Sequence, residues 1–206
     1  MSWIQTYRSR AFSFEKDAER VYDLEEIAHA LGNLCRFTGH ARRFYSVAEH
    51  QIHVGNRVVT LIDQKNSTSP RWPRTTGSPD LLDRRAGYRL GLFHDTPEAY
   101  LGDVSRPVKR LPFMEGYRAC EEMIFGEIRM VFELTKDPEL VALVKLADDE
   151  LLAAERDQVF LDQVRPEEWE WLPDPPPGID LEFLTPEVAS TRWLQAARRS
   201  LRKSLR

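Results

Sequence analysis

The sequence predicts an all-α protein, a helical bundle of about six helices with a small N-terminal β hairpin or arm. Two observations support this fold class. Apolar residues recur at intervals of three and four residues in several segments, and capping residues precede most of those segments. The 206 residues, 42% of them hydrophobic and 30% charged, can build one domain with a core and exclude a disordered or collagen-like chain. We therefore treat residues 1–206 as a single domain.

The first expected elements are a β arm and two helices. Residues 3–14 are rich in aromatic and β-branched side chains with rough alternation, which predicts the hairpin or arm. Asp23 is the expected N-cap of a helix that reaches about Cys35. Ser46 and Glu49 form a predicted capping box, which opens a second helix. One face of that helix carries His50, Val54, Val58 and Leu61.

A long polar loop is expected over residues 63–78. It is rich in Ser, Thr, Pro and Arg and exceeds the usual connection length, which favours a functional lid or a disordered excursion. Ser78 and Pro79 then predict the start of a helix. Its stripe follows at intervals of four residues: Leu82, Ala86, Leu90 and His94. Pro97 weakens that helix, and Gly102 is its expected stop.

Three more helices complete the prediction. The first spans residues 115–134, and the second begins at Asp137. The second has a stripe of Leu140, Val144, Asp148, Leu151 and Leu152. After a proline-rich loop over residues 166–178, a C-terminal helix is expected over residues 186–204, with basic residues at its negative end.

Polar residues interrupt three of these apolar stripes. His50, His94 and Asp148 each lie where the pattern calls for an apolar side chain, and Asp95 follows His94 directly. Buried carboxylates are costly unless they are paired or bound to a cation, and helical bundles commonly hold metal sites in their cores. Two readings compete: a shared metal site, or hydrogen-bonded core histidines beside a solvated Asp148-Asp149-Glu150 run.

Four ordered motifs favour the metal site. They are Arg36-Phe-x-Gly-His40, Tyr45-Ser-Val-Ala-Glu-His50, Leu92-Phe-His-Asp-Thr-Pro-Glu-Ala-Tyr-Leu-Gly-Asp103 and Leu146-Ala-Asp148. Over roughly residues 20–160 the chain resembles the HD-domain phosphohydrolase superfamily, and in particular its bacterial 5′-deoxynucleotidases and phage-type deoxynucleoside triphosphohydrolases. The resemblance implies a helical bundle with the metal ligands His50, His94, Asp95 and Asp148. Such a donor set suits one divalent transition metal (Co, Mn, Zn, Fe or Ni), and Mg²⁺ could accompany the substrate phosphates.

The resemblance also implies roles for residues around the metal. Glu98 would position or activate the attacking water, and Asp103 matches a second carboxylate near water and sugar. The expected substrate contacts are Arg36, Phe37, His40, Arg43, Arg106 and Lys109, with Phe37 stacking on a base. Arg43 belongs to the locally basic stretch 36–57, whose arginines suit phosphate oxygens. Pro97 and the loop at 63–78 depart from the family pattern.

Charge and composition narrow the expected partners. The net charge of −4 argues against stable nucleic-acid binding, whereas a small nucleotide can be held by one cation and a few arginines. The two cysteines form no disulfide framework, and neither a membrane span nor a signal peptide is recognisable, so a cytoplasmic protein is expected. The resemblance implies a homo-oligomer.

The predicted function is metal-dependent hydrolysis of nucleotides, favouring deoxynucleoside 5′-mono- or triphosphates, by attack of a metal-activated water on phosphorus. The sequence leaves two alternatives: a non-catalytic HD module that senses a nucleotide or metal, and a phosphodiesterase for a signalling nucleotide. Base preference, the physiological metal and the choice between monophosphate and triphosphate stay open.

Overall fold

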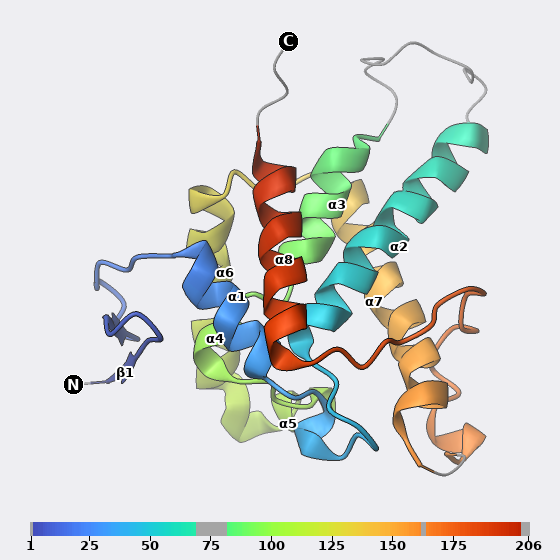
Figure 1. Ribbon diagram of the computed structural model, residues 1–206, viewed down its shortest axis with the longest axis horizontal. Helices are drawn as coiled ribbons and strands as arrows, with labels where there is room; N and C mark the ends of the chain where they lie inside the picture. The colour runs from blue at the N-terminus through green and yellow to red at the C-terminus, as the bar shows by residue number, and fades with distance from the viewer. Residues whose placement is uncertain (1, 69–81, 162–163, 203–206) are drawn as a thin grey trace.

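The computed structural model describes residues 2–68, 82–161 and 164–202, and most of these residues are helical (Figure 1). The prediction of an all-α fold is confirmed. Six helices have ten residues or more: α1 (Leu24–Asn33), α2 (Val47–Thr68), α3 (Arg84–Phe93), α6 (Glu115–Val131), α7 (Pro138–Val159) and α8 (Pro186–Leu201). Shorter helical turns are η1 (Phe37–Gly39), α4 (Glu98–Leu101), α5 (Arg106–Lys109), η2 (Pro112–Met114) and η3 (Pro166–Glu168).

The N-terminal arm is a β hairpin, as predicted. Strands β1 (Trp3–Gln5) and β2 (Ala11–Ser13) pair antiparallel, with Ile4 opposite Phe12. The Phe12 ring is buried and stacks on Tyr100 of α4, with 3.9 Å between ring centroids. This contact attaches the hairpin to the bundle beside α4.

Helix α2 is the centre of the bundle. It packs against α1, α3, α7 and α8, and Figure 1 shows α8 between α1 and α2. The buried indole of Trp193 on α8 donates a hydrogen bond from Nε1 to Oε1 of Gln51 on α2, at 2.6 Å. No helix in the described ranges is long and apolar enough to cross a membrane.

The start of α2 differs from the predicted capping box. Ser46 accepts the backbone N–H of Glu49, as a capping residue should. Glu49 does not close the box, because its carboxylate accepts three backbone N–H groups of a distant segment, those of Glu182, Phe183 and Leu184, at 2.8–3.0 Å. Glu49 therefore ties the segment before α8 to the base of α2.

The predicted loop at residues 63–78 is wrong over residues 63–68, where α2 continues. The amide of Asn66 stabilises this extension by pairing with the backbone of Leu82, donating to its carbonyl at 3.2 Å and accepting its N–H at 3.1 Å. Helix α3 begins at Arg84, directly after Leu82 and the capping residue Asp83. The remaining loop residues and the predicted cap at Ser78 lie outside the described residues.

The caps of three other helices agree with the sequence signals, but α1 ends at Asn33 before the predicted Cys35, and α6 ends at Val131 before the predicted residue 134. Asp23 caps α1, Asp137 caps α7 and Thr185 caps α8, each through its side chain. Helix α3 ends before Pro97, and α4 ends at Gly102, whose φ of 81° favours glycine. Helix α8, predicted over residues 186–204, ends at Leu201.

Two glycines allow α2 and α3 to approach closely. A Cβ atom added to Gly91 would lie 3.0 Å from the Cα of Gly55 and 3.1 Å from a methyl carbon of Val58. The two helices run antiparallel, so a close contact between positions 55 and 91 also brings positions 50 and 94 together. The ring centroids of His50 and His94 are 5.3 Å apart.

We expect Gly91→Ala to lower the free energy of unfolding by about 1–3 kcal/mol. The added Cβ would meet the backbone of Gly55, which cannot shift unless the rest of α2 shifts with it. The matched control is Gly126→Ala in α6, where, apart from the adjoining backbone of the same helix, no atom of the described residues lies within 4 Å of the added Cβ. This control should gain about 0.5–1 kcal/mol from its lower unfolded-state entropy. Urea denaturation measures both, and equal effects would contradict the close-packing argument.

Candidate metal centre

Three helices bring the four predicted metal ligands together. His50 lies in the first turn of α2, His94 and Asp95 follow α3 directly, and Asp148 lies in the middle of α7. One ligand atom from each residue can be chosen so that all lie within 4.8 Å of one another. Nε2 of His50 lies 3.4 Å from Oδ1 of Asp148 and 3.6 Å from Oδ2 of Asp95. Nε2 of His94 lies 3.1 Å from Oδ2 of Asp95.

Both imidazoles are oriented by their other ring nitrogen. Nδ1 of His50 lies 2.7 Å from Oε1 of Glu155, and Nδ1 of His94 lies 2.8 Å from the carbonyl oxygen of Gly91. The two buried Nε2 atoms have no hydrogen-bond partner among the described residues. A histidine that donates from one nitrogen to a carboxylate or carbonyl and offers the other is the usual arrangement of a metal ligand. The four residues therefore fit a divalent cation.

The electrostatics of the cluster also favour a cation. Burial opposes ionisation of Asp95 and Asp148, but the neighbouring histidines hold the pKa of each carboxyl well below its usual range. Burial and Arg36 lower the pKa of His50, yet Glu155 and Asp148 outweigh them and raise it to about 9. Without a metal ion, a proton on His50 balances part of the negative charge. A metal ion and that proton would compete for the same nitrogen.

Glu155 is one of the site residues that the sequence did not predict. Its carboxylate is fully buried on α7 and binds three partners: Arg36, Tyr45 and Nδ1 of His50, at 2.7–3.0 Å. The sequence did carry a signal, because Glu155 follows Asp148 by seven residues, which is two helical turns along the same face. The apolar stripe predicted for this helix ends at Leu152, one turn before Glu155.

Arg36 contacts both a buried carboxylate and the pocket. It was predicted to contact phosphate, and it lines the pocket beside the cluster. It is also nearly buried, with Nη2 3.0 Å from Oε2 of Glu155 and Nη1 3.9 Å from Oδ2 of Asp95. Arg36 therefore neutralises Glu155 and presents the rest of its guanidinium to the pocket.

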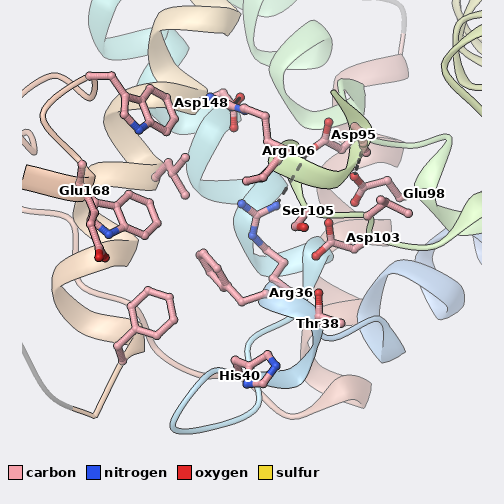
Figure 2. A pocket seen from close by; sticks show the side chains of 18 residues that line it. Arg36, Thr38, His40, Asp95, Glu98, Asp103, Ser105, Arg106, Asp148 and Glu168 are labelled. Atoms are coloured by element: carbon pink, nitrogen blue, oxygen red, sulfur yellow. Dashed lines mark hydrogen bonds and ion pairs between the residues drawn. The ribbon is translucent and has the colours of Figure 1, made fainter. Parts of the chain in front are cut away.

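A pocket of about 550 Å³ lies over the cluster. The predicted residues in its lining are Arg36, Phe37, His40, Asp95, Glu98, Asp103, Arg106, Lys109 and Asp148. Figure 2 shows Asp95, Glu98, Asp103 and Asp148 around one end of the pocket, with Arg36 reaching in from the side of Thr38 and His40. Arg43 is not brought into this lining, because its guanidinium lies over the ring of Phe183, 5.0 Å from the centroid.

Glu98 is buried at the edge of the pocket. Its Oε1 accepts a hydrogen bond from Nζ of Lys109 at 3.1 Å, and its Oε2 has no partner within the described ranges. Burial, followed by the charges of Asp95 and Asp103, raises the pKa of Glu98 well above its usual value. The raised pKa favours the protonated form of Glu98, and a general acid or base must be able to take up and release a proton.

Arg106 connects the cluster to the far side of the pocket. Its guanidinium donates to Oδ2 of Asp148 at 2.8 Å and to Oδ1 of Asp149 at 2.7 Å. It also lies 5.4 Å from the ring centroid of Trp171. Trp169, Trp171 and Phe160 line the pocket but were not predicted as site residues. The sequence feature that could have indicated this part of the pocket is the presence of two tryptophans in an otherwise acidic and exposed segment.

The fold and the site define a mostly helical protein with a His/Asp cluster beside a pocket. No model of a known protein family matches the chain. The chain is 33% identical over 162 residues to a protein of Escherichia coli (strain K12) described as the uncharacterized protein YfdR. The match covers 79% of this chain and 75% of that protein. The chain therefore belongs to the same family as YfdR.

We expect Glu155→Gln to weaken Mn²⁺ binding about 10- to 100-fold, because His50 loses the carboxylate that orients it and strengthens its basicity. Calorimetric titration of the purified protein with Mn²⁺ measures this change. Glu139→Gln, an exposed substitution in the first turn of the same helix, should leave the affinity unchanged. Unaltered Mn²⁺ affinity in a folded Glu155→Gln protein would refute the orienting role.

Proposed function

We propose that this protein is a metal-dependent phosphohydrolase of the HD-domain type that acts on nucleotides. The observation that carries the proposal is the cluster of His50, His94, Asp95 and Asp148 beside the pocket, in which two oriented imidazole nitrogens have no hydrogen-bond partner among the described residues. The order of the four HD-like motifs along the chain supports the same assignment.

The donor set of two imidazoles and two carboxylates would hold one first-row divalent ion without selecting sharply among Mn²⁺, Fe²⁺, Co²⁺, Ni²⁺ and Zn²⁺. When bound, such an ion supplies a Lewis acid for the phosphoryl group and lowers the pKa of the attacking water. Arg106 holds one oxygen of Asp148 by a hydrogen bond, which orients that carboxylate.

The charge of the pocket explains why hydrolysis would depend on a metal. Five acidic side chains line it, Asp95, Glu98, Asp103, Asp148 and Glu168, against the three basic side chains Arg36, Arg106 and Lys109. A phosphate dianion would be repelled by this excess of carboxylates. A divalent cation reverses the balance, and the three basic side chains can then contact phosphate oxygens.

Glu98 is the residue best suited to move the proton in this reaction. Lys109 holds its Oε1, so Oε2 remains to exchange a proton with the attacking water or with the leaving oxygen. Asp103 lines the same end of the pocket and would help to position the water. Arg36 would contact the phosphate while it stays paired with Glu155.

With Mn²⁺ or Co²⁺, we expect the protein to hydrolyse at least one deoxynucleoside 5′-mono- or triphosphate. EDTA and Asp95→Asn should abolish this activity, because both remove the metal. Chromatography of the products distinguishes phosphate, pyrophosphate and triphosphate as the released group. Metal-loaded protein that binds nucleotides but cleaves none would favour the sensing module instead.

We expect Glu98→Gln to lower kcat about 10²- to 10⁴-fold, because the amide cannot exchange the proton. Mn²⁺ affinity should remain within about twofold, since Glu98 is not one of the proposed ligands. Steady-state kinetics and calorimetry measure the two effects separately. The control is Glu122→Gln on the exposed face of α6, and an equal loss of kcat there would contradict a specific role for Glu98.

A further inference from the structure

Four aromatic side chains form one part of the pocket lining: Phe37, Phe160, Trp169 and Trp171, called here the aromatic wall. The rings are neighbours, with centroids 5.3 Å apart for Phe37 and Phe160 and 6.3 Å apart for Phe160 and Trp169. Trp169 and Trp171 belong to the segment after α7, beyond the region that carries the HD-like motifs.

Two arginines connect the aromatic wall to the metal cluster. Arg36 lies over the ring of Phe37, 5.4 Å from its centroid, and its Nη1 is 3.9 Å from Asp95. Arg106 lies over Trp171 at the same distance and bonds to Asp148. The pocket therefore has an aromatic part and a cluster of carboxylates, and each of the two arginines contacts both parts.

The tryptophan rings of the aromatic wall are more exposed than aromatic side chains in a packed core. Trp171 is 53% exposed and Trp169 is partly exposed, although both lie in a concave surface. Exposed tryptophan rings in a pocket give up unfavourable contact with water when a flat ligand stacks on them. Each nucleobase has such a flat face, and stacking does not require a particular base.

We propose that the aromatic wall binds the base of the nucleotide by stacking, with Trp169 and Trp171 as its main contacts. The phosphate then lies beside Arg36 and Arg106, next to the metal cluster. The inference rests on the proposed function and adds the feature by which the pocket would prefer a nucleotide to a sugar phosphate or free phosphate. Trp169 and Trp171 are specificity-determining residues in this arrangement, and neither has a part in the chemical step.

The test uses a ligand that cannot be hydrolysed. In the phosphonate analogue of deoxyadenosine 5′-monophosphate, a methylene group replaces the bridging oxygen. We expect it to bind the Mn²⁺-loaded protein about 5- to 100-fold more tightly than inorganic phosphate, as stacking on one or two rings would give. Trp169→Ala and Trp171→Ala should each remove much of that advantage. Trp169→Ala should also leave the affinity for inorganic phosphate unchanged, whereas Trp171 supports Arg106 and so its variant tests base binding only. Isothermal titration calorimetry measures both affinities.

Two controls separate stacking from structural damage. Trp169→Phe and Trp171→Phe keep a stacking ring and should retain affinity within a few-fold. Trp3→Ala removes an exposed tryptophan of the hairpin that does not line the pocket, and it should change neither affinity. If the analogue binds no more tightly than phosphate to the wild-type protein, or if the folded alanine variants keep full affinity, the inference is overturned.

The inference and the proposed function can fail independently. Tight, tryptophan-dependent binding of the analogue without hydrolysis of any nucleotide would overturn the proposed function and leave the base-binding wall intact. Hydrolysis of deoxynucleotides and of deoxyribose 5-phosphate with equal kcat/KM would support the function and overturn the role of the wall.

Discussion

The buried carboxylate of Glu155 is the interaction on which the site depends. An ionised carboxylate in the core is costly unless charged or hydrogen-bonding partners surround it, and Glu155 obtains three of them from other parts of the chain. Arg36 and Tyr45 lie on the two sides of the turn that leads into α2, and His50 lies in the first turn of that helix. A single negative charge on α7 thereby fixes the positions of Arg36, which lines the pocket, and of His50, which belongs to the His/Asp cluster.

The remaining ligands depend on how closely the helices pack. The contact between Gly55 and Gly91 lets α3 approach α2, which places His94 beside His50. Directly before His50 in the first turn of α2, Glu49 binds three backbone N–H groups of the segment before α8 and holds that segment on α2. Polar contacts and one close helix crossing therefore position residues that are far apart in the sequence.

These contacts produce a pocket with two chemically different parts. Carboxylates form one part of its lining, with His50 and His94 next to two of them, and aromatic rings form another part. Arg36 and Arg106 contact both parts. A ligand with an anionic group and a flat ring, joined by a short spacer, fits this division. We therefore regard the segment after α7 as part of the recognition surface and not only as a connection to α8.

The sequence by itself determined the fold class, most helix ends and the candidate ligands, because apolar periodicity, capping residues and polar interruptions are local signals. It did not determine that α2 continues to Thr68, since that extension depends on Asn66 meeting Leu82 across the following segment. The sequence also did not reveal the partners of Glu49 and Glu155. A carboxylate at helical spacing is equally consistent with a helix cap, a solvated surface charge or a buried ion pair. Only the tertiary structure decided which carboxylates are buried. A buried carboxylate needs hydrogen-bonding or charged partners, so it fixes the positions of the side chains around it.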